Sequence, residues 1–101
     1  EVLDFGMFSV HKSAGQLIVN GTEQHCTAKE FELLVFFCEH PNRIYTAQQL
    51  YEQVWGPSLQ GDDKTVVIHI SKLRKKIEPD PAKPVMLVNM RGIGYKFVPP
   101  K

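Results

Sequence analysis

The basic side chains of this chain gather in one segment, residues 64–77, which holds five Lys or Arg and no Asp or Glu. Winding the segment at about 100° per residue gives one aliphatic stripe, formed by Val66, Ile70, Leu73 and Ile77. The opposite side is mostly basic and consists of Ile68, Ser71, Lys72 and Lys75. This pattern is typical of a helix that is anchored by its apolar face and presents cations to a polyanion.

One exposed aliphatic residue narrows the choice of polyanion. An Ile among Lys and Ser is unusual on a surface that only faces water. In the major groove of DNA, however, the thymine methyl group is an apolar feature among hydrogen-bonding base edges. We therefore expect Ile68 to contact a thymine methyl group and Lys72 a guanine edge. An ordinary amphipathic surface helix is the alternative for this segment.

The charge is distributed unevenly along the 101 residues, whose formal net charge is +1. Residues 1–63 hold three basic and nine acidic side chains, a net charge of −6. Residues 64–101 hold nine basic and two acidic side chains, a net charge of +7. A polyanion would therefore bind to the C-terminal third. The length fits one domain with a single core.

Other kinds of site find little support. Cys26 and Cys38 are too few and too badly spaced for a zinc site, so we expect no metal and no cofactor. The simplest interpretation is two reduced thiols in a cytoplasmic protein, although the sequence alone also allows a disulfide. Glu39 and His40 lie beside Cys38, but adjacent side chains on a helix diverge by about 100°, so they cannot form a catalytic dyad. No apolar run approaches the ~18 residues of a membrane span, and no signal peptide is visible.

The elements that position the basic helix are indicated by turns and caps. Four β-prone runs, at residues 3–5, 8–11, 16–19 and 22–25, predict a small antiparallel sheet, with Asn20-Gly21 as a hairpin turn. Thr27 and Glu30 form a capping box that starts a helix at Ala28, which ends near His40.

The middle and the end of the chain complete the pattern. Residues 44–45 are expected to pair briefly with a strand, and Thr46 caps a second short helix that Gly56 and Pro57 stop. Residues 56–63 have the composition of a loop. Residues 85–90 and 95–98 predict a terminal hairpin, and Arg91 places a cation at its tip.

This order of elements predicts an α+β fold, a winged helix-turn-helix in one domain over residues 1–101. The N-terminal antiparallel sheet takes residues 1–25, the three-helix core residues 27–78, and the C-terminal β-hairpin wing residues 85–98. The last helix, which we call the recognition helix, would enter the major groove, and the wing would reach the neighbouring backbone or minor groove.

Three segments, residues 63–66, 69–77 and 91–97, resemble the C-terminal effector domain of OmpR/PhoB-type two-component response regulators. The resemblance covers essentially the whole chain, including the Thr-x-x-Glu-Phe-x-Leu-Leu motif at residues 27–34 and the Leu-x-x-x-Val-Trp motif at residues 50–55. It implies a cytoplasmic regulator of transcription in a phosphorelay, which binds double-stranded DNA sequence-specifically and is not an enzyme. A winged-helix protein-interaction module that docks on an acidic partner is the alternative.

The same resemblance implies further parts and partners. The chain begins at Glu1 without an initiator Met, and we expect a receiver domain with a phosphorylatable Asp to precede it in a longer protein. That domain would receive its phosphoryl group through a sensor kinase and would control dimerisation, giving a homodimer on tandem half-sites. RNA polymerase would be a partner of the DNA-bound regulator, and no membrane contact is expected.

The resemblance also assigns contacts to positions. Phosphate contacts fall on Lys64, Thr65, His69 and Arg74. Lys72 lies where such regulators commonly have a base-reading Arg or Lys, and the periodicity places Ile68, Ser71 and Lys75 on the same face. On the wing, Arg91 would enter the minor groove while Asn89 and Tyr95 touch the sugar-phosphate backbone. The loop that would meet RNA polymerase includes Trp55, Ser58, Leu59 and Gln60.

Some of these positions have other interpretations. His69 is equally well explained as a packing residue on the helix flank, and Tyr95 better as a core residue of the wing with a polar tip. Trp55 fits a hydrophobic anchor for the loop. The chain departs from many relatives at Ser71, often a basic position, and at Val67 and Ile68, which place two apolar residues on or beside the reading face.

Overall fold

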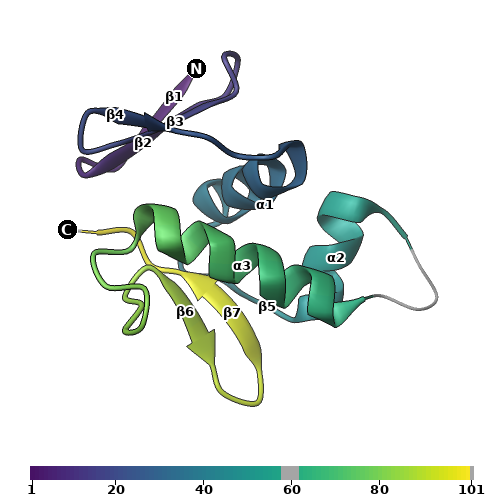
Figure 1. Cartoon of the computed structure of the whole chain (residues 1–101). Coiled ribbons are helices and arrows are strands. Elements are labelled where there is room, and N and C mark those ends of the chain that lie inside the picture. Colours follow the sequence, from purple (N-terminus) through teal and green to yellow (C-terminus); the bar gives the residue numbers. More distant parts are fainter. Residues whose placement is uncertain (58–61, 101) are drawn as a thin grey trace.

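A computed structural model describes residues 1–57 and 62–100, which form two antiparallel sheets and three helices (Figure 1). The N-terminal sheet follows sequence order and contains β1 (Val2–Asp4), β2 (Phe8–His11), β3 (Gln16–Val19) and β4 (Thr22–Gln24). The second sheet has the order β5-β7-β6 and contains β5 (Ile44–Tyr45), β6 (Leu87–Met90) and β7 (Gly94–Phe97). The helices are α1 (Ala28–Glu39), α2 (Ala47–Trp55) and α3 (Asp63–Ile77). The predicted winged helix-turn-helix is thus confirmed.

The N-terminal sheet follows from alternation and one tight turn. Its inward side chains, which are buried, are Phe8, Val10, Leu17 and Val19. Asn20 and Gly21 both have positive φ, 50° and 82°, between the paired residues Val19 and Thr22, as the hairpin signal predicted. The first strand ends at Asp4 instead of Phe5, because Phe5 donates its backbone N–H to Phe8 across the turn, at 2.9 Å.

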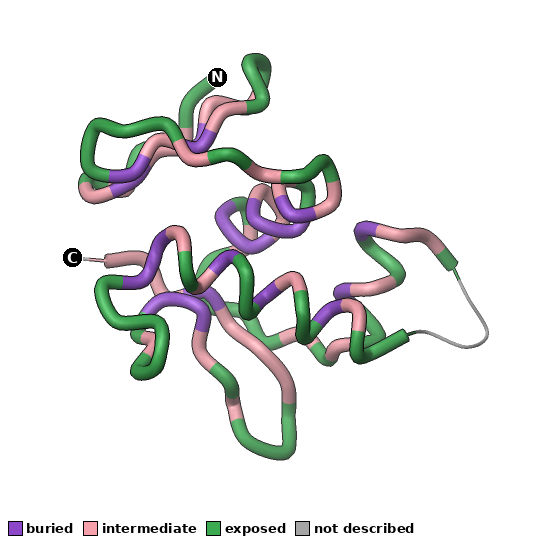
Figure 2. Tube along the Cα trace, viewed as in Figure 1, coloured by how far each residue is buried: buried purple, intermediate pink, exposed green. Residues whose placement is uncertain are grey.

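Capping boxes fix the starts of α1 and α2. The Thr27 side chain accepts from the N–H of Glu30, whose carboxylate accepts from the N–H of Thr27. Thr46 and Gln49 repeat this arrangement at α2. One face of α1 is buried (Figure 2), and α2, α3 and β7 all contact this helix.

An aromatic cluster joins the two sheets. Phe5 and Phe97 meet edge to face with their ring centroids 5.2 Å apart, and Phe8 lies 5.1 Å from Phe5. Phe8 and Phe97 are almost completely buried. Aromatic pairs in this geometry add to the stabilisation that burial alone provides. The base of the wing is therefore held by the N-terminal sheet as well as by α1.

The first wing strand is shorter than the predicted run at residues 85–90, and the second begins one residue before the predicted run at 95–98. The first strand starts at Leu87, and the backbone N–H groups of the two preceding residues, Val85 and Met86, donate to the Glu78 carboxylate. The second strand starts at Gly94, which pairs with Met90 and lies so close to β5 that an added Cβ would be 2.2 Å from the carbonyl oxygen of Tyr45. Only glycine fits there.

Candidate nucleic-acid interface

The recognition helix α3 begins at Asp63, one residue before the predicted start, because Asp62 is its N-cap. One carboxylate oxygen of Asp62 accepts from the N–H groups of Lys64 and Thr65, and the other accepts from the Thr65 hydroxyl at 2.7 Å. The Thr65 hydroxyl bond is the main reason that the pKa of Asp62 lies below its ordinary value. Negative charge at this end also complements the helix dipole.

The two faces of α3 are as periodicity predicted. The apolar stripe of Val66, Ile70, Leu73 and Ile77 is at most 1% exposed. The opposite side is exposed to solvent and carries Lys64, Ile68, Ser71, Lys72 and Lys75. Ile68 is 52% exposed and Val67 46%, so two aliphatic side chains stand among the cations of this face. The face offers both charge for phosphates and apolar surface for base methyl groups.

One flank of α3 packs on the first two helices. His69 meets Trp55 edge to face, with ring centroids 4.8 Å apart, and its Nδ1 donates to the carbonyl oxygen of Thr65 at 2.7 Å. Lys76 donates to the buried carboxylate of Glu30, in the first turn of α1, in an ion pair at 2.6 Å. Trp55, which also stacks on Tyr51, therefore anchors the end of α2 against the recognition helix.

The other flank of α3 faces the wing. Arg74 is half-buried, and its Nε donates to the carbonyl oxygen of Leu87 at 2.9 Å. The hairpin of β6 and β7 projects beyond α3 (Figure 1), with Arg91 exposed at its tip. Asn89 is exposed and pairs across the hairpin with the half-buried Tyr95. The wing thus carries one exposed cation next to the basic face of α3.

Charge is separated in space as it is in sequence. The acidic side chains of residues 1–57 lie on or beside the N-terminal sheet, α1 and α2, whereas the basic ones of residues 64–100 belong to α3, the wing and their connection.

Among the described residues, no group of three or more His, Cys, Asp or Glu is placed to hold a metal ion. No helix formed by residues 1–57 or 62–100 has the length and apolarity to cross a membrane. Cys26 and Cys38 are free thiols.

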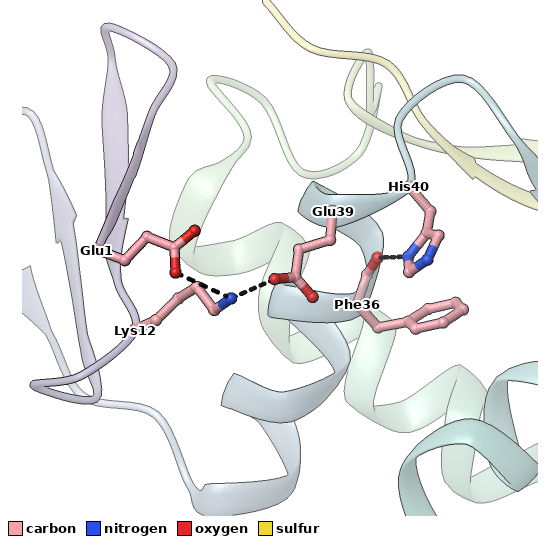
Figure 3. Close-up of polar contacts among 5 residues, drawn as sticks. All are labelled: Glu1, Lys12, Phe36, Glu39 and His40. Carbon is pink, nitrogen blue, oxygen red and sulfur yellow. Dashed lines mark hydrogen bonds and ion pairs between the residues drawn. The ribbon is translucent and has the colours of Figure 1, made fainter.

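A groove of about 340 Å³ lies on the side of α1 away from α3, lined by Lys12, Phe31, Glu32, Val35, Phe36, Glu39, Gln53 and Val54. Its charges are neutralised locally: Lys12 pairs with Glu1 and Glu39 (Figure 3), and Glu32 with Lys29. The bond to Glu39 is the main reason that the pKa of Lys12 is raised.

The same view bears on the residues beside Cys38. Glu39 points to Lys12, whereas Nδ1 of His40 donates to the carbonyl oxygen of Phe36 at 2.8 Å (Figure 3). Burial raises the pKa of Cys38 to about 12. Glu39 and His40 therefore make contacts at the end of α1, while Cys38 is buried in the core. Their side chains do not converge on one point, as the sequence predicted.

Sequence reasoning missed the contacts that hold α3 in place. Glu78, which is buried directly after α3, accepts hydrogen bonds from three backbone N–H groups and was not singled out. The Glu30–Lys76 pair joins residues 46 positions apart. The only sequence signal for the Glu78 contacts is an acidic residue between the apolar stripe of the helix and the Pro-rich connection. Ser58, Leu59 and Gln60, predicted to form a partner surface, lie outside the described residues.

Comparison with known proteins settles the family. Residues 21–97 match the family described as "Transcriptional regulatory protein, C terminal". The chain belongs to this family. It is 45% identical over 95 residues to the transcriptional regulatory protein YvrH of Bacillus subtilis, covering 94% of the chain and 40% of YvrH. It is 42% identical over 96 residues to the sensory transduction protein RegX3 of Mycobacterium tuberculosis, covering 95% of the chain and 42% of RegX3. The chain thus spans about two fifths of the length of these relatives.

Solved structures agree with this assignment. The DNA-binding domain of RstA from Klebsiella pneumoniae, solved in complex with the RstA box, superposes with a TM-score of 0.87 at 25% identity, covering 98% of each chain. The response regulator DrrB of Thermotoga maritima, an OmpR/PhoB homologue, gives a TM-score of 0.86 at 30% identity, covering 96% of this chain and 44% of DrrB. The chain is therefore a winged-helix output domain of the OmpR/PhoB type. This is a family of DNA-binding transcription regulators and not of enzymes, so a pure protein-interaction module is not favoured.

Proposed function

We propose that α3 enters the major groove of double-stranded DNA while the wing reaches the adjacent minor groove, so that the chain selects an operator sequence. The observation that carries this proposal is the exposed face of α3, where cations surround Ile68, next to the exposed Arg91 of the wing. Cations bind phosphates irrespective of sequence, whereas base edges in the major groove distinguish one sequence from another. The face has groups for both tasks.

The contacts of the free domain refine the assigned roles. Lys64 is exposed at the start of α3 and is ready to meet a phosphate. The Thr65 hydroxyl and Nδ1 of His69 already donate within the domain, so a phosphate contact by either atom requires a change of partner. Arg74 has its Nε bound to the wing, which leaves only its terminal nitrogens for DNA. We therefore place base reading on Ile68, Ser71, Lys72 and Lys75, and minor-groove contact on Arg91 with Asn89 and Tyr95 beside it.

Selection from random duplexes tests this proposal. The wild-type chain should enrich one sequence element, and its affinity should fall steeply with salt. Lys72→Ala should lose both affinity and preference. Lys29→Ala is the matched control, because Lys29 lies on α1 and its ammonium group already binds Glu32 and the carbonyl oxygen of Val54. Equal behaviour of the two variants, or no enriched element, would contradict the proposal.

The loop between α2 and α3 is proposed to meet RNA polymerase. The segment from Trp55 to Asp63 contains two acidic residues and no basic one, so it is poorly suited to lie on phosphates. Asp62 is occupied as the cap of α3, so the proposal rests on Ser58, Leu59 and Gln60, with Leu59 as the apolar anchor. A plain solvated loop is the alternative.

A triple variant with Ala at positions 58, 59 and 60 tests the loop in the full-length regulator. Promoter activation in cells should fall at matched protein levels, while operator affinity in vitro stays unchanged. Full activation with unchanged affinity would contradict the partner surface. Loss of both together would assign the loop to positioning the recognition helix.

The remaining partners belong to the longer protein. By family, we propose a receiver domain controlled by a sensor kinase in the cytoplasm, and a homodimer on tandem half-sites. What supports this is the length of the relatives, of which this chain spans about two fifths. Operator DNA with one or two half-sites, compared by mobility shift with the phosphorylated full-length protein, would show whether the second copy binds cooperatively.

A further inference from the structure

A buried carboxylate links the end of the recognition helix to the base of the wing. Glu78 directly follows α3 and is 7% exposed. Its Oε1 accepts from the N–H of Val85 at 2.9 Å, and its Oε2 accepts from the N–H groups of Met86 and Leu87 at 3.0 and 2.7 Å. Hydrogen bonds to an ionised acceptor are about twice as strong as neutral ones. Three consecutive amides are thus fixed to one side chain at the point where the wing begins.

A second contact acts on the same residue of the wing. Arg74, one turn before Glu78, donates its Nε to the carbonyl oxygen of Leu87. Leu87 therefore has its N–H and its C=O both bound by side chains of the α3 end. The last strand of the wing is held as well, since Val98 donates its N–H to the carbonyl oxygen of Met86 at 2.7 Å. We call Arg74, Glu78 and their backbone partners at 85–87 the helix–wing clamp.

The cations in the last turn of α3, Arg74, Lys75 and Lys76, favour an acidic residue at position 78, but they do not account for its burial. The carbonyl end of a helix carries partial negative charge, which disfavours a carboxylate, and burial adds a desolvation cost. The three amides of residues 85–87 offset both effects only when the wing adopts this geometry. The Glu78 side chain therefore favours one arrangement of helix and wing over others.

We propose that Glu78 is a positioning residue for DNA recognition, which holds Arg91 at a fixed offset from the reading face of α3. This inference rests on the proposed function. Arg91 comes four residues after Leu87, the last residue of the clamp, so at about 3.3 Å per residue of extended chain it lies roughly 13 Å from the clamp. A rotation of roughly 10° at the base would move the tip by about 2 Å, enough to break a hydrogen bond to DNA.

A double-mutant cycle on the 101-residue chain tests the proposal. Glu78→Gln keeps the size of the side chain but replaces one accepting oxygen with an NH2 group. On a duplex carrying the selected element with A·T-rich flanks, it should weaken binding roughly five- to tenfold, while in the Arg91→Ala background the loss should nearly vanish. Thr27→Ala is the control, because it removes a cap of α1 far from the wing, and its effect should be equal in both backgrounds.

Amide hydrogen exchange of the free chain gives an independent measurement. Glu78→Gln should speed exchange across residues 87–97 and leave α1 protected. If Glu78→Gln does not fold, Glu78→Asp, which retains the charge but is one methylene shorter, takes its place. Unchanged exchange in the wing, or an equal loss of affinity in both backgrounds, would overturn the positioning role while leaving DNA binding intact. A wild-type chain without salt-dependent duplex binding would instead overturn the proposed function, and the DNA role of Glu78 with it.

Discussion

Ile68 offers a direct test of how the α3 face reads bases. Complete burial of an Ile side chain is worth about 1.5–3 kcal/mol, and Ile68 is 52% exposed in the free domain. Covering the exposed half by DNA should therefore contribute about 0.8–1.5 kcal/mol, so Ile68→Ala should weaken operator binding roughly four- to twelvefold. A single thymine methyl group opposite Ile68 accounts for about 0.8 kcal/mol of this, or roughly fourfold.

Replacing each thymine of the selected element by deoxyuridine removes only the methyl group. The wild-type chain should lose about fourfold at one or two positions, and Ile68→Ala should lose almost nothing more at those positions. Val67→Ala is a close control, because Val67 is the adjacent residue and is exposed to a similar extent, 46%. In the Val67→Ala variant, deoxyuridine at the thymines that couple to Ile68 should weaken binding as much as it does in the wild-type chain.

One result would refute this reasoning. If no deoxyuridine replacement weakens the wild-type chain more than it weakens Ile68→Ala, then Ile68 contacts no thymine methyl group. An affinity loss on Ile68→Ala without any such coupling would then reflect general apolar contact with the groove wall or the sugars.

Four further outcomes are expected. Lys64→Ala should lower the slope of log affinity against log salt concentration by about 0.9, and an unchanged slope in titrations would remove Lys64 from the phosphate contacts. Arg91→Ala should lose most affinity on A·T-rich flanks, where the narrow minor groove is most negative; equal losses on G·C-rich flanks would make Arg91 a general phosphate contact. Gly94→Ala should cost about 3 kcal/mol in urea unfolding, because its Cβ meets the backbone of β5, and a smaller loss would show that β5 can shift. Burial raises the pKa of Glu30, but hydrogen bonds from Lys76 and the Thr27 backbone lower that pKa by more. The contribution of Glu30 to stability is therefore complete above the ordinary pKa of about 4.3 and should be lost as the pH falls below this value. Glu30→Gln should flatten the pH dependence of the free energy of unfolding in this range.

Local signals predicted most of the fold. The Thr27 capping box and the Asn20-Gly21 turn depend on residues within three positions of each other, so the sequence contains the whole interaction. The apolar stripe of α3 is similarly local, because periodicity alone defines it. The start of the wing was misplaced for the opposite reason. Val85 has the composition of a strand residue, but its N–H is taken by Glu78, seven positions earlier.

The sequence predicted which side chains of α3 are exposed, but it did not predict the contacts that hold the flanks of the helix in place. A helical wheel shows that Ile68 and Lys72 lie opposite the core, but it does not show what the flanks of the helix meet. His69 proved to lie against Trp55, and Arg74 against the carbonyl oxygen of Leu87. Both contacts depend on how α2 and the wing pack on α3. That packing is decided by the whole core and is not encoded in the recognition segment alone.

The spatial separation of charge in this domain has a kinetic consequence. A body with most of its basic side chains on α3, the wing and their connection, and most of its acidic ones on the N-terminal sheet, α1 and α2, experiences a torque in the field of DNA. It is turned toward the duplex before contact, so a larger share of diffusional encounters begins with the recognition helix in front. The dominant effect of added salt should accordingly be on the association rate.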